Sequence, residues 1–430
     1  MITTDKRIDR DRAIAWYKKN RARTAEIFGL LTDEAYYDQP IALRHPIVFY
    51  EGHIPAFSLN TLVKKALGKP GVDERLERLF ARGIDPDETH AGSSAPFTWP
   101  ARPEVRAFVE AADAMVLDAL AHETLEVPGH PLLDRADAVY TILEHEAMHQ
   151  ETLLYMWHRL PHDKKRRPSS YRVVTDGSPA TPAEIGIPGG RVRLGARPGS
   201  IPFGWDNEFG ETTVDVAPFS VARFNVTNGD FLEFMDAGGY ARPELWSSAD
   251  WAWVQEHGLR HPIFWKHDAD GGRWRWRGMF EYLPLPLEWP VYVSHAEASA
   301  YARWRERRLL TEAEYQRLVT PFPAGGHYDF AGFEPEPVGT HPEGRSADGV
   351  DDLVGNGWEW TSTIFRPFPG FHASASYPEY SADFFDESHY VMKGASPVTA
   401  RELARPTFRN WFRPRYPYVY ATFRLAGNGS

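Results

Sequence analysis

The first 160 residues carry apolar side chains at the spacing of amphipathic helices. Residues 103–120 have the clearest pattern, because they open with Pro-Glu-Val and repeat apolar residues every three or four positions. Residues 9–30, 53–67 and 134–160 repeat the pattern, and residues 32–34 (Thr-Asp-Glu) have the composition of a capped helix start. Four such segments predict an antiparallel bundle, whose core is a usual place for metal sites built from side chains.

The pattern becomes irregular after residue 160. A polar, proline-rich stretch with four consecutive basic residues follows the last helical segment and predicts a linker. Residues 191–195 then alternate as a short strand does, and residues 228–237 and 295–308 have helical patterns. The predicted fold is therefore α+β, with a helical bundle at residues 1–165, a linker at 166–186 and a mixed domain at 187–430.

The composition excludes several classes of protein. With 430 residues, 42% apolar and 25% charged, the chain has the make-up of a globular protein with more than one domain. Its net charge of -11 argues against a nucleic-acid partner, and its apolar runs are too short to span a membrane. The N-terminal residues lack the hydrophobic core of a secretory signal, so we expect a cytoplasmic protein. Because there is no cysteine, candidate metal ligands are confined to His, Asp and Glu.

The fourth helical segment contains a candidate metal motif, Glu-His-Glu-Ala-Met-His-Gln-Glu at residues 144–151. His145 and His149 are four apart and share one face of a helix, where two imidazoles can bind one metal ion. The stretch also fits the H-E-x-x-H pattern of zinc proteases. However, Thr152 and Tyr155 occupy the Gly and His positions of the longer protease motif, and a basic stretch follows. We therefore disfavour a protease, while a polar helix face without metal remains an alternative.

A third ligand is available upstream. His53 stands at the start of the apolar segment 53–67, where a histidine alone is more often a capping or core residue. Together with His145 and His149 it would complete a three-histidine site that leaves coordination positions open. Such a neutral donor set suits iron(II), although zinc fits equally well.

The chain resembles a known family through a series of short motifs in a fixed order. The motifs occupy residues 52–57 (Gly-His-Ile-Pro-Ala-Phe), 144–151, 203–209 (Phe-Gly-Trp-Asp-Asn-Glu-Phe), 225–229, 310–315, 355–361 and 405–411. These motifs are similar to those of the ergothioneine-pathway sulfoxide synthases and their neighbours, the ovothiol-pathway enzymes and selenoneine synthase. The resemblance extends over nearly the whole chain, and its two-domain arrangement agrees.

The resemblance implies a fold, a cofactor and a reaction. It implies a DinB-like four-helix bundle that carries one non-haem iron(II) on His53, His145 and His149. It further implies a C-terminal formylglycine-generating-enzyme-like domain related to C-type lectins. The reaction uses oxygen to join a sulfur or selenium donor to C2 of the imidazole of hercynine (N-α-trimethylhistidine), so the partners are small molecules.

Substrate and proton-donor residues also follow from the resemblance. Trp411 would face the quaternary ammonium of hercynine through cation–π attraction, and Asn410 would bind its carboxylate. Tyr377 best matches the family's proton-donating tyrosine, with Tyr380 as the fallback, although a surface loop aromatic is an equally good interpretation of Tyr377.

Three departures from the family's ergothioneine branch concern the donor. Met148 replaces a glutamine, Phe412 and Tyr416 replace an acidic residue and an arginine, and residues 394–397 read Gly-Ala-Ser-Pro instead of Gly-Gly-Ser-Trp. Losing the acid–arginine pair removes charge-assisted recognition of a doubly charged thiol peptide. Aromatic rings suit the apolar face of a sugar, so we favour the selenoneine synthase branch, whose donor is a selenosugar.

Other interpretations stay open at this point. Arg413 and Arg415 can still bind an acidic donor, which keeps γ-glutamylcysteine or cysteine as alternatives. A lectin-like binding module without catalysis is a rival from a different class, although three retained histidines argue against it. Trp205, Trp358 and Trp360 are expected in the core. Residues 206–208 can coordinate calcium or close a turn, and we favour the turn.

Overall fold

The computed structural model describes residues 8–81, 98–177, 181–268 and 272–429. The chain divides into two compact units. The helical unit comprises residues 1–168 together with residues 373–380, and the mixed unit comprises residues 169–372 and 381–430. Among the described residues, none of the helices combines the length and the apolar content needed to cross a lipid bilayer.

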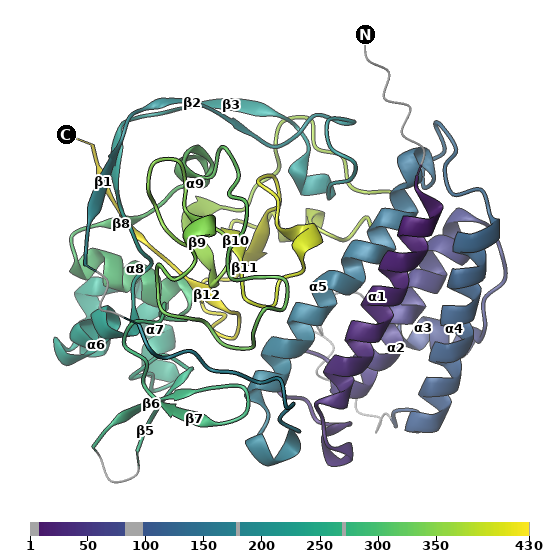
Figure 1. The fold of residues 1–430 in the computed structure, drawn as a ribbon, viewed down its shortest axis with the longest axis horizontal. Helices are drawn as coiled ribbons and strands as arrows, with labels where there is room; N and C mark the ends of the chain where they lie inside the picture. The colour runs from purple at the N-terminus through teal and green to yellow at the C-terminus, as the bar shows by residue number, and fades with distance from the viewer. Residues whose placement is uncertain (1–7, 82–97, 178–180, 269–271, 430) are drawn as a thin grey trace. The chain divides into compact units, whose positions relative to one another are not determined.

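The helical unit is built on long helices that run alongside one another (Figure 1). Helix α2 packs on α4, and α1 packs on α5. A π-helical segment, Leu59–Ala66, continues α2. The α-helices of the described part of this unit are α1 (Arg10–Gly29), α2 (Ile47–Ser58), α3 (Glu74–Leu79), α4 (Arg102–His122) and α5 (Asp137–Arg159).

The start of α2 differs from its prediction. The helix begins at Ile47, with Pro46 as its N-cap residue, rather than at His53. Proline tolerates this position because its φ is already helical and the first turn needs no donor from it. His53 consequently lies inside the helix and not at its end. At residues 32–34, where a capped helix start was expected, a 3₁₀ helix of one turn, Asp33–Ala35, begins after Thr32 as its N-cap residue, but the Thr32 side chain makes no capping hydrogen bond.

Helix α5 begins three residues later than predicted. Arg135 and Ala136 adopt left-handed φ angles of 52° and 57°, which no α-helix can contain. Asp137 is therefore the first residue of the helix. From there to Arg159 the helix is largely buried, including His145 and Glu146.

The described part of the mixed unit contains four sheets and several short helices. One four-stranded sheet has the order β1-β4-β13-β8 and another the order β11-β10-β9-β12, while β2-β3 and β5-β6-β7 form smaller sheets. Among the named strands that the structure describes, the pairings are antiparallel except that of β12 with β9. The strands are β1 (Glu184–Ile187), β2 (Gly190–Leu194), β3 (Thr212–Val216), β4 (Phe219–Ala222), β5 (Trp265–His267), β6 (Trp274–Arg277), β7 (Tyr282–Pro284), β8 (Arg308–Leu309), β9 (Gly357–Ile364), β10 (Tyr390–Ala395), β11 (Asn410–Phe412), β12 (Ala421–Thr422) and β13 (Leu425–Asn428). The helices are α6 (Asn228–Asp236), α7 (Ser248–Glu256), α8 (His295–Trp304) and α9 (Glu312–Leu318).

These elements match three sequence predictions and correct a fourth. The strand at residues 191–195 and the two helices are present as β2, α6 and α8, although α8 ends at Trp304 rather than at residue 308. Strand β1 begins at Glu184, inside the stretch expected to be a linker.

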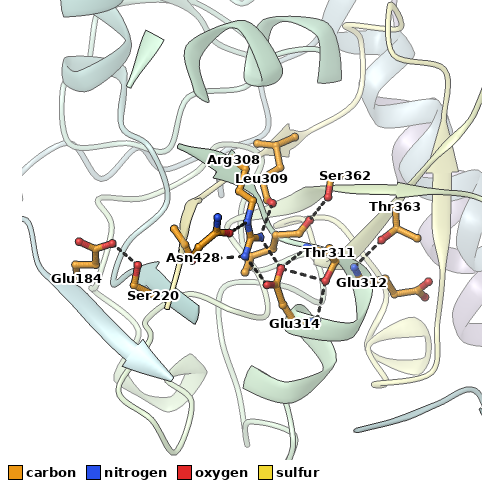
Figure 2. Close-up of polar contacts among 12 residues, drawn as sticks. Glu184, Ser220, Arg308, Leu309, Thr311, Glu312, Glu314, Ser362, Thr363 and Asn428 are labelled. Atoms are coloured by element: carbon orange, nitrogen blue, oxygen red, sulfur yellow. Dashed lines mark hydrogen bonds and ion pairs between the residues drawn. The ribbon is translucent and has the colours of Figure 1, made fainter. Parts of the chain in front are cut away.

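The motif at residues 310–315 joins the two four-stranded sheets (Figure 2). Thr311 and Glu314 cap α9 reciprocally, and the Glu314 carboxylate also accepts two hydrogen bonds from Arg308 on β8, at 2.6 and 2.8 Å. Arg308 reaches Asn428 on β13, while the Glu312 backbone N–H donates to Thr363 Oγ1 on β9 at 2.8 Å. This family-like motif therefore has a structural role.

The predicted core tryptophans are buried. Trp205, Trp358 and Trp360 are each at most 2% exposed. The motif at residues 355–361 also supplies Glu359, which forms a buried ion pair of 2.6 Å with Arg424. At residues 206–208 a 3₁₀ turn forms, in which Glu208 accepts hydrogen bonds from Arg405, as expected for a turn.

Candidate metal centre

Helices α2 and α5 bring three histidines together in the helical unit. His53 comes from α2, and His145 and His149 come from adjacent turns of α5. One ring nitrogen of each lies within 4.8 Å of the others. The ring planes are inclined by 64° to 79° to one another, with centroids 4.4 to 5.2 Å apart. Lone pairs in the planes of such inclined rings can converge on one point.

The protonation of the three rings favours metal binding. His53 Nδ1 donates to the Phe80 carbonyl oxygen at 2.7 Å, which leaves Nε2 as the unprotonated nitrogen. Burial lowers the pKa of His53 to about 4. The pKa values of His145 and His149 also lie well below the usual range, because both rings are desolvated and neighbouring imidazoles disfavour a second charge. All three side chains are therefore neutral at pH 7, as metal ligands must be.

The spacing of the ring nitrogens and the neutral charge of the three imidazoles both fit a divalent ion among these rings. The Nε2 atoms of His145 and His149 are 3.1 Å apart. Two imidazole nitrogens at about 2.1 Å from one ion and at a right angle would be about 3.0 Å apart. Without a cation or a shared proton, two such lone pairs would repel each other. A set of three neutral imidazoles suits iron(II) or zinc.

The opposite face of α5 fixes the helix on α1. Glu146 is completely buried, and its Oε1 accepts hydrogen bonds from Arg21 Nη1 at 2.8 Å and Thr24 Oγ1 at 2.6 Å. Gln150, one turn on, donates to the Asn20 carbonyl oxygen at 2.9 Å. A zinc protease would need Glu146 beside the metal as a base. Because this carboxylate is bound to α1 instead, the geometry agrees with rejecting a protease.

The two candidate tyrosines belong to the helical unit, through its segment 373–380. The Tyr377 ring lies 5.1 Å from Phe57 and 6.0 Å from His145 between centroids. Phe57 itself stacks on His145 at 3.5 Å. The Tyr380 hydroxyl is 3.3 Å from Met148 Sδ. The structure therefore brings Tyr377, Tyr380 and Met148 to the three histidines.

The other six predicted residues belong to the mixed unit. Trp411 on β11 stacks on Phe365 with centroids 4.4 Å apart and planes at 5°. Phe412 and Tyr416 stack on each other at 5.1 Å and 14°. The carboxamide oxygen of Asn410 accepts from the Trp411 backbone N–H at 2.9 Å. Arg413 is exposed.

Arg415 has an acidic partner within its own unit. Its Nε lies 2.9 Å from Oδ1 of Asp250, whose side chain is 12% exposed. The Asp250 carboxylate therefore offsets part of the positive charge of Arg415, a residue that the sequence suggested for binding an acidic donor.

A second group of candidate ligands was not anticipated from the sequence. His327, Glu336 and His341 lie within 4.8 Å of one another in the mixed unit. The two imidazoles are nearly parallel, at 16°, so lone pairs in their planes do not converge. Three of their four ring nitrogens already bond to oxygens of Glu334, Glu336 and Glu343 at 2.8 to 3.2 Å. This group is a hydrogen-bonded cluster rather than a metal centre.

Comparison with known families defines the class of protein. Residues 17–153 match the DinB superfamily, and residues 171–326 and 320–428 match the sulfatase-modifying factor enzyme 1-like domain. The chain is thus a DinB-type helical bundle joined to a sulfatase-modifying-factor-like domain, which confirms the predicted fold class.

Named relatives narrow the class to a family. A "Hercynine oxygenase" of Mycolicibacterium thermoresistibile is 33% identical over 389 residues, which cover 83% of this chain and 81% of that protein. Another, from Mycolicibacterium smegmatis, is 33% identical over 345 residues, which cover 75% and 77%. The "Ergothioneine biosynthesis protein 1" of Schizosaccharomyces pombe is 27% identical and covers 93% of this chain and 54% of its own length. The chain belongs to the hercynine oxygenase family, and the resemblance to ergothioneine-pathway enzymes is confirmed.

Proposed function

We propose that this protein is an oxygen-dependent, non-haem iron(II) enzyme that joins a selenosugar to C2 of the hercynine imidazole. The observation that carries the proposal is the group of three neutral, buried histidines with converging nitrogens on α2 and α5. Membership of the hercynine oxygenase family supports hercynine as the acceptor. A sulfur donor, γ-glutamylcysteine or cysteine, is the alternative.

His53, His145 and His149 would hold the iron, whose role when bound is to activate oxygen and bring the two substrates together. Apolar rings surround this ligand set: Phe49 stacks on His53 at 4.8 Å, and Phe57 stacks on His145 at 3.5 Å. These rings exclude water and hold the imidazoles in orientation. Tyr377, against His145, is the proposed proton donor to the reacting oxygen, with Tyr380 as the second candidate.

The proposed reaction balances with oxygen as the only oxidant. The C2–H bond of hercynine and the hydrogen–selenium bond of the donor break, and one carbon–selenium bond forms. Both hydrogens leave with one oxygen atom as water, and the other oxygen remains on the selenium. A thiol donor would give the sulfoxide by the same balance.

Hercynine recognition is proposed for Trp411 and Asn410. The Trp411 indole is held by a stack on Phe365 and by a tilted contact with Phe384 at 5.7 Å, and the trimethylammonium group would meet the indole through cation–π attraction. The carboxamide of Asn410, fixed by its bond to the Trp411 backbone, would bind the carboxylate.

The selenium donor is favoured by the charges near β11. The ergothioneine branch uses an acid–arginine pair where Phe412 and Tyr416 form a parallel stack, and a stack of rings offers an apolar surface to a sugar. Arg413 and Arg415 are both exposed, and Arg415 is paired with Asp250, which offsets part of its charge. A doubly charged thiol peptide would therefore find less compensation than a neutral sugar.

A competition assay tests the proposal. Protein purified anaerobically and loaded with iron(II) is given hercynine, oxygen and equal concentrations of a selenosugar, γ-glutamylcysteine and cysteine, and products are identified by mass spectrometry. We expect the carbon–selenium product to predominate. Turnover with γ-glutamylcysteine alone would overturn the assignment of a selenosugar as donor. Failure to take up stoichiometric iron would overturn the assignment of the protein as an iron(II) enzyme.

A further inference from the structure

We propose that Asp137 and Ser376 are positioning residues, which hold segment 373–380 on α5 so that Tyr377 stays against His145. This inference rests on the proposed function, because it assigns a purpose to the placement of the proposed proton donor. Nothing in the sequence pattern pairs these two residues, since they are 239 positions apart.

The first observation is a buried hydrogen bond at one end of the segment. Ser376 Oγ donates to Asp137 Oδ2 at 2.5 Å, and Ser376 is 1% exposed. A hydrogen bond to a carboxylate is shorter and stronger than one between neutral groups. Because Tyr377 directly follows Ser376, any movement of the serine moves the tyrosine with it.

The second observation is the placement of Asp137 itself. It is the first residue of α5, after two consecutive residues in the left-handed conformation, Arg135 and Ala136. Non-glycine residues rarely adopt this conformation, and they persist in it where the surrounding structure over-determines them. The turn places the Asp137 carboxylate at the helix start, where it meets Ser376.

The third observation is a contact at the other end of the segment. The Tyr380 hydroxyl lies 3.3 Å from Sδ of Met148, the residue before His149. Asp137 and Met148 are eleven residues apart on α5, or about 16 Å along its axis. His145 lies between these two attachment points, and the Tyr377 ring lies 6.0 Å from it. The segment is thus held on both sides of the histidine that Tyr377 contacts.

Kinetics of single and combined variants test the positioning role. Ser376→Ala and Asp137→Ala should each lower kcat by on the order of 10-fold to 100-fold, the range for a small displacement of a reacting group. Iron affinity and the KM for hercynine should not change, since the three histidines and Trp411 are untouched. Asp137→Asn, which keeps an acceptor for Ser376, should restore most of the rate. Asp118→Ala, at a 64% exposed carboxylate of α4, is the matched control.

Two further results distinguish the positioning role of Ser376 from the proton-donor role of Tyr377. In a Tyr377→Phe background, Ser376→Ala should cause no additional loss of kcat; an additional loss would overturn a role exerted through Tyr377. If Tyr377→Phe alone retains full activity, the proposed proton donor is wrong, and this outcome is distinct from failure of the positioning bond.

The position of Tyr377 can also be followed by ¹⁹F NMR in metal-free protein, without measuring activity. Metal-free protein carrying 3-fluorotyrosine at position 377 should give one narrow ¹⁹F resonance in the parent and in Asp118→Ala. The resonance should shift and broaden in Ser376→Ala and Asp137→Ala and recover in Asp137→Asn. An unchanged resonance in both alanine variants would overturn the proposal.

Discussion

Buried, neutral histidines are the residues on which the proposed site depends. His53, His145 and His149 all have pKa values lowered by burial, and His295 in the mixed unit shares this property. His295 has a different setting: its Nε2 bonds to the Thr361 carbonyl oxygen at 3.1 Å and its ring stacks on Tyr390 at 3.8 Å. His295 can therefore be used to measure how a buried, neutral imidazole that is not a candidate metal ligand affects the free energy of unfolding.

Acidification should destabilise the mixed unit through His295. Its pKa is about 4 in the folded protein and about 6.5 in an unfolded chain, so between these values the unfolded chain binds more protons. The free energy of unfolding should fall as pH falls from 6.5 to 4, by about 3 kcal/mol for this residue at most. Urea unfolding can be followed by tryptophan fluorescence, because twelve of the fifteen tryptophans lie in the mixed unit.

The variant His295→Phe isolates this contribution. Phenylalanine keeps the stack on Tyr390 but cannot be protonated, so the variant should be less stable than the parent at pH 7 and less sensitive to acid. Equal loss of stability in parent and variant between pH 7 and pH 4.5 would contradict the assignment.

Donor choice is also a property of single side chains. Phe412→Asp combined with Tyr416→Arg replaces the ring stack by an acid and a base, and should lower the KM for γ-glutamylcysteine by about 10-fold while raising that for the selenosugar. Phe412→Leu with Tyr416→Leu removes the rings without adding charge and serves as the control. No change in the thiol-peptide KM would count against the pocket argument.

Among the elements, α5 serves two purposes on two faces. His145 and His149 point toward α2, while Glu146 and Gln150 bind α1. The same eight-residue motif therefore supplies candidate ligands and the contacts that hold them in place. Because Glu146 bonds to Arg21 and Thr24, its carboxylate contributes to stability and not to chemistry.

Substitutions at Glu146 should separate these purposes. Glu146→Ala leaves Arg21 with Asp113 as its remaining partner in the ion-pair network and should cost about 3 kcal/mol of unfolding free energy. Glu146→Gln retains an acceptor for Arg21 and Thr24, so it should keep iron binding and turnover with a smaller loss of thermal stability. If Glu146→Gln abolished turnover in a stably folded protein, Glu146 would have a chemical role after all.

At the scale of the whole molecule, local patterns in the sequence predicted the long helices. The same patterns did not predict contacts between residues far apart in the chain. The spacing of His145 and His149 is a helical repeat and predicts their shared face. His53 lies on another helix, so no local spacing pairs it with them. The sequence offered it as a candidate third ligand upstream, and the family resemblance then implied the same residue. The bond between Ser376 and Asp137 has no local signal. In the mixed unit, strands of two to eight residues are too short for periodicity to locate, so only β2 and two helices were predicted.

Metal content tests whether the described part of the protein has one metal centre or two. Reconstitution with iron(II) should give one ion per chain, and His149→Gln should abolish tight binding because it removes one of three ligands. His341→Gln should leave the metal content unchanged, since the parallel rings of His327 and His341 cannot direct their lone pairs to one ion. Binding should also raise the unfolding free energy of the parent by about 2.7 kcal/mol at 100 times the Kd. A second equivalent of metal that disappears in His341→Gln would show that the cluster in the mixed unit rearranges to bind an ion, and that the molecule has two centres.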